Sequence, residues 1–166
     1  MNTALAMSRV WRFGSDIDTD VLAPGIYMKR PLEELATHCL EAVRPEFAAQ
    51  VRPGDVLVAG PNFGIGSSRE QAAGVLRHLG LAAVIAPSFS GLYFRNAFNL
   101  GLLLLTCERA TEIQEGERIA VRWTPGSDTP EVQRANGERL PCAPIPAFLM
   151  DMVQAGGLLP LLKQQR

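Results

Sequence analysis

A glycine-rich turn between two apolar segments constrains the fold of this chain more than any other feature. Val56 to Ala59 is an unbroken apolar run, and from Gln71 to Leu79 the apolar residues recur at helical spacing. Between them lies Gly60-Pro61-Asn62-Phe63-Gly64-Ile65-Gly66-Ser67-Ser68-Arg69-Glu70. The pattern predicts a strand, a loop and a helix over residues 68–79 that ends at Gly80. The loop glycines allow positive φ and let a ligand approach the main chain.

The same loop predicts an anion site. Ser67 and Ser68 are expected at the helix N-terminus, where free N–H groups and the helix dipole favour negative charge. Arg69 adds a charged, forked donor that matches a carboxylate or a phosphate. The alternative is that the serines only cap the helix. The loop has no lysine after its last glycine, and Arg69 stands where a dinucleotide loop needs glycine, so a carboxylate is favoured over a phosphate.

The remaining apolar segments predict an α/β fold. Residues 82–86 and 102–105 are apolar runs typical of strands buried on both faces, and a helix is expected between them. Alternation of strand and helix favours parallel, right-handed βαβ units. After residue 107 the pattern changes to short β segments at 117–123 and 131–140, a turn at 125–128 and a helix over 145–154. We expect residues 1–166 to form a single domain.

Composition excludes several functional classes. The chain has 166 residues, a formal net charge of −1 and no run of like charge, so neither nucleic acid nor an anionic membrane is an expected partner. It has no apolar segment of membrane-spanning or signal-peptide length, which predicts a cytoplasmic protein. Cys39, Cys107 and Cys142 are widely spaced, so we expect buried thiols rather than a disulfide framework or a self-contained metal site.

Two polar segments precede the glycine loop. Asp16, Asp18 and Asp20 alternate along the chain, but the glycine and the distant glutamate of an EF-hand loop are missing. Turn and capping roles are the simplest explanation for any one of them. Lys29 and Arg30 precede a helix expected over residues 32–40, and such a pair is most often a solvated surface feature.

These segments carry a family resemblance. Asp16-Ile17-Asp18-Thr19-Asp20, Gly64-Ile65-Gly66-Ser67-Ser68-Arg69-Glu70 and Arg95-Asn96-Ala97-Phe98-Asn99-Leu100-Gly101 occur in the order seen in the swivel domain of the aconitase superfamily. The chain resembles the small subunits of 3-isopropylmalate dehydratases over most of residues 8–160. The resemblance implies a three-layer β/β/α swivel domain of the aconitase C-terminal type, with a mainly parallel central sheet.

The resemblance also implies a function. Such chains are small subunits of heteromeric hydro-lyases, which interconvert 2-hydroxy and 3-hydroxy acids by dehydration and rehydration. A large subunit carries the 4Fe-4S cluster on its own cysteines, so we expect this chain to bind no cofactor and to be inactive alone. By resemblance Ser67 is the catalytic base, Arg69 and Ser68 hold the substrate carboxylate, and Asp20 lies in the active site. Arg95 and Asn96 are expected to brace the serine loop or a neighbouring subunit.

The identity of the substrate depends on Lys29 and Arg30. In the resembling enzymes this tip covers the variable substituent of the substrate, and isopropylmalate-type members carry an apolar residue about where Lys29 stands. Homoaconitase-type members carry a cation there. An isopropylmalate is therefore the first expectation, and a homoaconitate-type or methylmalate-type acid is the alternative. Arg30 can instead contact a substrate carboxylate while Lys29 faces water.

Two residues differ from the family pattern, and a non-enzymatic function is the competing hypothesis. Ile65 and Gln71 stand where many relatives have Cys and His, and both adjoin the proposed base. The competing hypothesis is a non-catalytic regulatory module that uses the same loop to bind a small carboxylate or phosphate. It predicts tight anion binding by the isolated chain, without an iron–sulfur partner.

Overall fold

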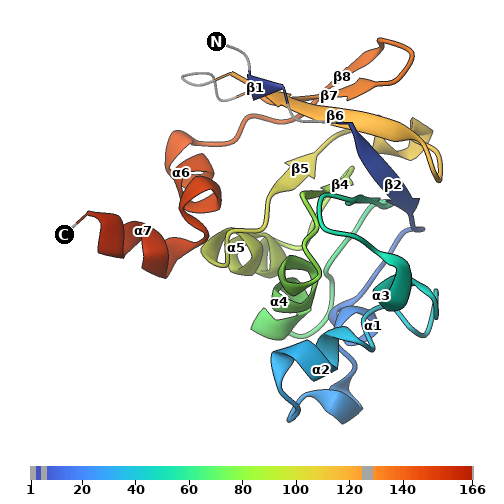
Figure 1. Ribbon diagram of the computed structural model, residues 1–166, viewed down its shortest axis with the longest axis vertical. Helices are drawn as coiled ribbons and strands as arrows, with labels where there is room; N and C mark the ends of the chain where they lie inside the picture. The colour runs from blue at the N-terminus through green and yellow to red at the C-terminus, as the bar shows by residue number, and fades with distance from the viewer. Residues whose placement is uncertain (1–2, 5–6, 125–128, 166) are drawn as a thin grey trace.

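The computed structural model describes residues 3–4, 7–124 and 129–165, and it shows a mixed sheet covered by helices (Figure 1). The strand order is β5-β4-β3-β2-β6-β7-β8, with β1 beside β6. The predicted turn at 125–128 lies outside the described residues. The strands are β1 Thr3–Ala4, β2 Ser8–Arg12, β3 Val56–Val58, β4 Ala83–Ala86, β5 Leu104–Thr106, β6 Arg118–Trp123, β7 Glu131–Arg134 and β8 Arg139–Pro141.

Four strands form the parallel part of the sheet. β2, β3, β4 and β5 pair in parallel, with Val10 opposite Val56 and Val56 opposite Ala83. Every residue of β3 and β4 is buried, because the helices cover one face of these strands and other strands cover the opposite face. This burial explains the unbroken apolar runs. The parallel pairing of β2, β3, β4 and β5 confirms the predicted parallel arrangement.

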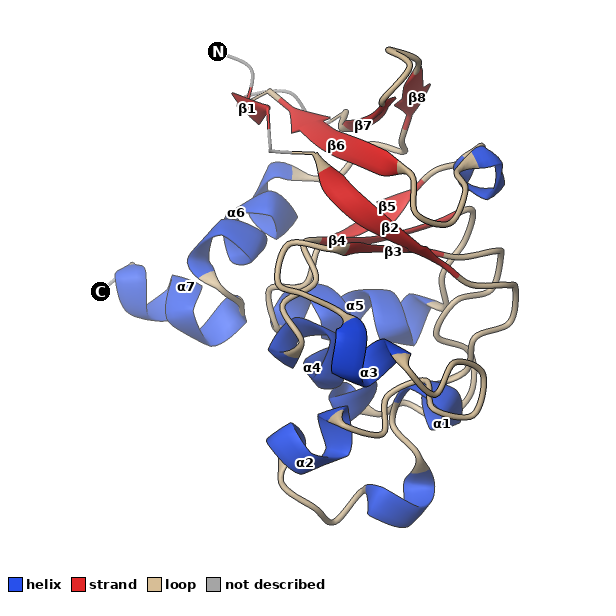
Figure 2. Ribbon diagram, turned by 45° about the vertical axis from the view of Figure 1, so that its right-hand side comes forward, coloured by secondary structure: helices blue, strands red, loops and turns tan. Residues whose placement is uncertain are grey.

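β2 connects the parallel strands to an antiparallel layer. Its first two residues, Ser8 and Arg9, pair antiparallel with β6, whereas its last three pair in parallel with β3. β6, β7 and β8 then continue as antiparallel neighbours. Figure 2 shows β6–β8 as an upper layer, β2–β5 as the middle layer and the helices below. The three-layer β/β/α prediction is therefore confirmed, with a central layer that is parallel.

The helices beneath the sheet position the loops at its carboxyl edge. α4 and α5 cover the parallel strands, and α2 packs against α4. α4 begins at Glu70 and α2 ends at Ala36, so both are shorter than their patterns predict. No helix in the described ranges has the length and apolarity needed to cross a bilayer. The helices are α1 Thr19–Leu22, α2 Leu32–Ala36, α3 Phe47–Gln50, α4 Glu70–His78, α5 Gly91–Asn99, α6 Ala147–Ala155 and α7 Leu158–Gln164, with 3₁₀ turns η1 Gly25–Tyr27 and η2 Ala110–Glu112.

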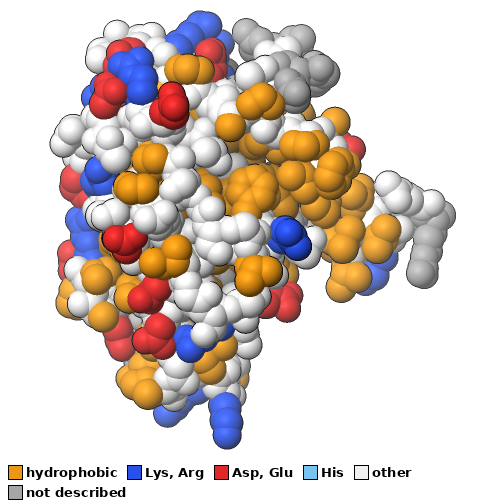
Figure 3. Space-filling view, turned by 180° about the vertical axis from the view of Figure 1, so that it is seen from behind, with side chains coloured by type: hydrophobic (Ala, Val, Ile, Leu, Met, Phe, Trp, Pro, Cys, Tyr) orange, Lys and Arg blue, Asp and Glu red, His pale blue; other side chains and the backbone are white. Residues whose placement is uncertain are grey.

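α6 and α7 form an arm at the C-terminal end of the chain. Gly156 ends α6 with φ of +93°, and α7 follows immediately. Figure 3 shows hydrophobic side chains gathered on the arm and on the surface beside it. Phe148, Leu159 and Leu162 on the arm are exposed by 63%, 70% and 47%. α7 therefore packs Leu158 and Leu161 against the core and leaves Leu159 and Leu162 exposed.

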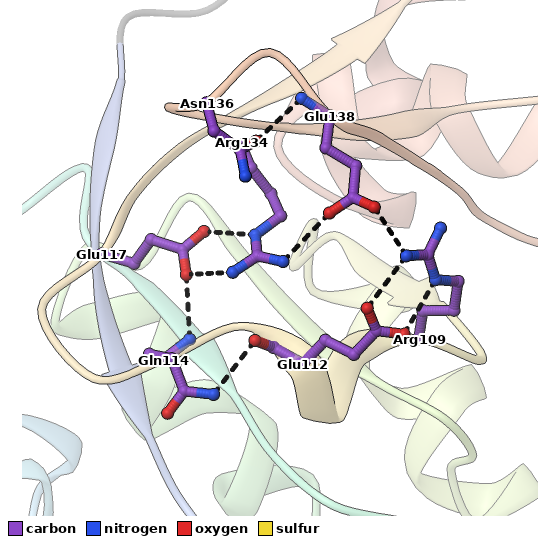
Figure 4. A network of polar contacts seen from close by, with 7 residues as sticks. All are labelled: Arg109, Glu112, Gln114, Glu117, Arg134, Asn136 and Glu138. Carbon is purple, nitrogen blue, oxygen red and sulfur yellow. Dashed lines mark hydrogen bonds and ion pairs between the residues drawn. The ribbon is translucent and has the colours of Figure 1, made fainter.

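A chain of alternating charges ties the antiparallel layer to the segment after β5 (Figure 4). Arg134 on β7 donates to both carboxylate oxygens of Glu117, at 2.7 and 2.9 Å, and to Glu138 at 3.0 Å. Arg109 donates to the other oxygen of Glu138 at 2.7 Å and to Glu112. Glu138 thus connects the β7–β8 hairpin with the η2 segment.

Candidate active site

The pairing of β2 with β3 continues beyond both strands and aligns the aspartate segment with the glycine loop. The two segments leave neighbouring parallel strands at the same edge of the sheet, where α/β proteins place their ligand sites. Five backbone hydrogen bonds of 2.7–3.0 Å hold them together: Phe13 N to Val58 O, Gly60 N to Gly14 O, Asp16 N to Pro61 O, Gly64 N to Ile17 O and Thr19 N to Ile65 O. The two motifs that the sequence singles out are therefore adjacent in space.

The glycines of the loop have different structural roles. Gly64 has φ of +83°, and a Cβ built there would lie 2.3 Å from the side chain of Tyr93. Gly66 has φ of +101°, a conformation that favours glycine. Gly64 and Gly66 adopt the positive φ that glycine allows, whereas Gly60 does not. Gly60 is required because a Cβ there would lie 2.8 Å from the backbone nitrogen of Ser15.

Asp20 and Arg69 form an ion pair between the two segments. Nη1 of Arg69 donates to Oδ1 of Asp20 and to the carbonyl of Ala23, both at 3.0 Å. The N–H of Gly25 donates to the same Asp20 oxygen at 2.9 Å. The hydrogen bond from Gly25, followed by the one from Arg69, lowers the pKa of Asp20. Both bonds of Arg69 use Nη1, so Nη2 and Nε remain available to a carboxylate.

The other aspartates have the structural roles that a turn motif predicts. Asp18 caps α1 by accepting a hydrogen bond from Val21 N at 2.8 Å. Asp16 has φ of +58° and accepts a hydrogen bond from the Asn62 side chain at 2.9 Å. Asp20 alone among the three contacts Arg69.

Ser67 and Ser68 are exposed and precede α4 without capping it. The N-cap of α4 is Arg69, whose backbone is extended at φ −125° and ψ 113° and whose side chain makes no capping bond. The predicted start of the helix at residue 68 was therefore two residues early, and the capping explanation of the serines does not hold. Nδ2 of Asn96 on α5 donates to Ser68 Oγ at 3.4 Å. Within the described chain, the Ser67 hydroxyl has no hydrogen-bond partner.

The backbone around the serines is rich in free donors. In the part of the chain that the structure describes, no N–H group from Gly66 to Gln71 donates to a protein acceptor. These groups include the first N–H groups of α4, which carry the positive end of its dipole. Successive free N–H groups of this kind bind anions. The arrangement is therefore suited to a carboxylate or to a developing oxyanion.

The segment that carries Lys29 and Arg30 begins next to the Asp20–Arg69 ion pair, but neither side chain is bonded to that pair in the described structure. Arg30 donates to Glu34 at 2.5 Å, and its guanidinium carbon lies 5.8 Å from the centre of the Tyr27 ring. Tyr27 in turn stacks on His38, with ring centres 3.7 Å apart. Lys29 is exposed and has no hydrogen-bond or ion-pair partner in the described ranges. Arg30 is thus held within its own segment, whereas Lys29 is bonded to no residue that the structure describes.

The two departures from the family pattern lie close to the serine loop. Ile65 forms an isolated parallel bridge with Asp18 and is half-buried. Gln71 is exposed in the first turn of α4 and lines a groove of about 360 Å³ together with Leu32 and Leu100. Among the described residues, Gln71 forms no hydrogen bond with either serine hydroxyl.

The described residues do not form a site for an iron–sulfur cluster. Cys39, Cys107 and Cys142 are all buried. Within the ranges that the structure describes, no three His, Cys, Asp or Glu side chains lie close enough together to hold a metal ion. The residues present therefore do not fit such a group.

The sequence pattern missed several groups that shape the site. The N–H of Gly25 and the carbonyl of Ala23 both engage the Asp20–Arg69 pair, and backbone groups of this kind leave no signal in side-chain identity. Asn96 contacts Ser68 as expected, whereas Arg95 is exposed and contacts neither serine. Tyr93 on α5 is buried in the core.

Comparisons with known proteins identify a matching family model and several similar chains. A family model described as the aconitase C-terminal domain matches residues 25–110. A 3-isopropylmalate dehydratase small subunit 1 from Archaeoglobus fulgidus is 44% identical over 162 residues, covering 96% of this chain and 98% of that protein. A methanogen homoaconitase small subunit from Methanothermobacter thermautotrophicus is 40% identical, covering 91% and 86%.

A solved structure is similar over nearly the whole chain. The crystal structure of a 3-isopropylmalate dehydratase from Methanocaldococcus jannaschii matches with a TM-score of 0.81 and 34% identity. The match covers 99% of this chain and 95% of that one.

Proposed function

This chain belongs to the aconitase C-terminal domain family, and from that premise we propose how its residues take part in a dehydration reaction. Its function is that of a small subunit of 3-isopropylmalate dehydratase, a hydro-lyase of leucine biosynthesis. One observation carries the proposal: the extended β2–β3 pairing joins Asp20 to Arg69 beside two exposed serines and a run of free N–H groups.

Ser67 is the proposed base. Its hydroxyl is exposed and unpartnered within the described chain, so it is free to face a substrate. The free N–H groups from Gly66 to Gln71 and the nearby Arg69 stabilise an alkoxide more than a neutral hydroxyl, which lowers the free energy of deprotonating Ser67. An alkoxide formed transiently can remove a proton from the carbon next to a carboxylate.

Arg69 and Ser68 hold the carboxylate of the substrate in this proposal. Nη2 and Nε of Arg69 have no hydrogen-bond partner within the described residues, and the Ser68 hydroxyl is exposed next to Arg69 in sequence. Asp20 orients Arg69, because it fixes Nη1 and leaves the rest of the fork for the substrate. Asp20 therefore acts through Arg69.

The small subunit works with a large subunit. A hydroxyl group is a poor leaving group and needs a Lewis acid, which we place in the large subunit as a 4Fe-4S cluster. We propose that residues 1–166 act as one swivel domain that brings Ser67 and Arg69 to that centre, since the parallel and antiparallel layers share β2. The buried, free thiols fit a cytoplasmic location.

The proposed substrate is an isopropylmalate, and a specific observation supports a second candidate. Lys29 is an exposed cation without a partner in the described chain, at the tip that covers the variable substituent in the family. An ammonium group gains nothing beside an isopropyl group, whereas it can pair with an additional carboxylate. The likeness to a homoaconitase small subunit favours the same alternative, a homoaconitate-type acid, and a methylmalate-type acid belongs in the same test.

A serine variant tests the base assignment. The chain is co-expressed anaerobically with its large subunit, and unsaturated-acid formation is followed by ultraviolet absorbance. Ser67→Ala should abolish turnover while the complex still assembles, because the side chain is exposed and bonded to no other described residue. Ser90→Ala is the matched control, since Ser90 precedes α5 without a side-chain capping bond. Near-normal turnover by Ser67→Ala would refute the assignment.

A substrate panel tests the acid. The same complex is assayed with isopropylmalate, homocitrate and 2-methylmalate, with Lys29→Ala as the companion variant. If Lys29 reads a carboxylate, only homocitrate turns over and Lys29→Ala removes that activity. If the substrate is isopropylmalate, Lys29→Ala leaves its turnover intact. If a cluster-loaded complex turns over none of the three acids and the isolated chain binds an anion, the result would instead support a regulatory module.

A further inference from the structure

α5 presents two side chains, one helical turn apart, to the serine loop. Tyr93 is 2% exposed, and its hydroxyl donates to the carbonyl of Ala72 in α4 at 3.0 Å. Its side chain fills the space beside Gly64. Asn96 follows at the i+3 position, on the same side of the helix, and its amide reaches Ser68. α5 therefore fixes the serine loop from below through Tyr93 and touches its polar end through Asn96.

The direction of the Asn96–Ser68 hydrogen bond determines what Ser68 can do. Nδ2 of Asn96 is a donor only, so Ser68 Oγ accepts at 3.4 Å. A hydroxyl that accepts from one side has its own proton free to donate elsewhere, and accepting a bond makes it a better donor. The bond is long, as polar contacts at active sites often are before the substrate binds.

We propose that Asn96 is a positioning residue that turns the Ser68 hydroxyl outward, so that its proton is donated to the substrate carboxylate. The inference rests on the proposed function, in which Arg69 and Ser68 share that carboxylate. Asn96 does not touch the substrate, and its whole effect passes through Ser68.

The test is a double-mutant cycle in the assembled, cluster-loaded complex. Asn96→Ala should raise KM about three- to tenfold, the effect of one neutral hydrogen bond, and leave kcat within about twofold. Asn96→Asp should raise KM further, because a carboxylate accepts the Ser68 proton instead of directing it to the substrate. In the Ser68→Ala background, Asn96→Ala should change KM by less than about twofold. The matched control is Asn99→Ala, an exposed asparagine three residues later on the same helix.

Each outcome decides the inference. An unchanged KM for Asn96→Ala overturns it, and so does a rise of equal size with and without Ser68, which would indicate a structural role for Asn96. Thermal unfolding of the free chain separates these cases, since the positioning role predicts similar midpoints for Asn96→Ala and Asn99→Ala. The proposed function fails separately, through an active Ser67→Ala complex. If the Ser67→Ala complex has no turnover and the Asn96→Ala complex has an unchanged KM, only the role of Asn96 is refuted.

Discussion

Replacing Gly64 by alanine tests the packing beneath the serine loop. Two costs add at this position. The backbone has φ of +83°, which costs an L-residue about 1–2 kcal/mol. The new Cβ would also lie 2.3, 2.5 and 2.8 Å from atoms of Tyr93, and overpacking of this kind costs about 1–3 kcal/mol.

Tyr93 cannot move away easily from an added methyl group. Its ring packs edge-on against Phe63, with centres 5.4 Å apart, and its hydroxyl is bonded to Ala72 O. We therefore expect Gly64→Ala to lower the free energy of unfolding by about 2–5 kcal/mol. The measurement is urea denaturation of the isolated chain, followed by circular dichroism.

Two other glycines separate the contributions. Gly116 has φ of +76°, and a Cβ added there would meet nothing within 4 Å, so Gly116→Ala should show the backbone cost alone. Gly91 has open space and no positive φ, so Gly91→Ala should be neutral or slightly stabilising. If Gly64→Ala costs no more than Gly116→Ala, the described packing of Tyr93 against the loop is wrong.

Three further variants probe the site and the charged groups. Arg69→Lys should raise KM more than tenfold with little loss of fold stability, because an ammonium cannot reproduce the fork that binds Asp20 and a carboxylate together; steady-state kinetics decide this. Asp55→Asn should cost about 2–3 kcal/mol at neutral pH, because Oδ2 accepts three bonds of 2.8–2.9 Å. Burial raises the pKa of Asp55, but the three hydrogen-bond donors outweigh burial, so the pKa in the folded state is lowered from 3.8. The ionised carboxylate therefore stabilises the fold fully above pH 3.8, and this stabilisation is lost as the pH falls through the folded-state pKa. Urea titrations in acid should therefore show the two proteins converging. Glu138→Gln should shift the urea midpoint only slightly, and less at high salt, because the side chain is half-exposed and its ion pairs are screened by water and salt.

Local patterns predicted the buried strands well because their cause is local. Residues 56–58 and 83–86 are apolar throughout since both faces of β3 and β4 are covered. The antiparallel pairing of β2 with β6 was not predicted, because no nearby residue records which distant strand supplies the second edge.

The candidate site also combines features that the sequence predicts with features that it does not. The motifs predict Ser67, Arg69 and Asp20 as site residues, and the structure pairs Asp20 with Arg69. The predicted start of α4 was too early. The local sequence favours a helix from residue 68, but Arg69 has an extended backbone while its side chain bonds to Asp20 and to the carbonyl of Ala23. The bond of Arg30 to Glu34 has helical i,i+4 spacing, so the charge pattern alone is enough to predict it.

The divided pairing of β2 has a consequence for the order of folding. Val10 pairs with Val56, whereas Ser8 pairs with Ile119. Residues close together in β2 therefore have pairing partners at very different separations along the chain. Contacts between distant residues form slowly, because a long loop must close first. During synthesis, the parallel strands and the loops that carry Ser67 and Asp20 can assemble before β6 leaves the ribosome. The start of β2 would then have an unpaired edge until the last third of the chain arrives.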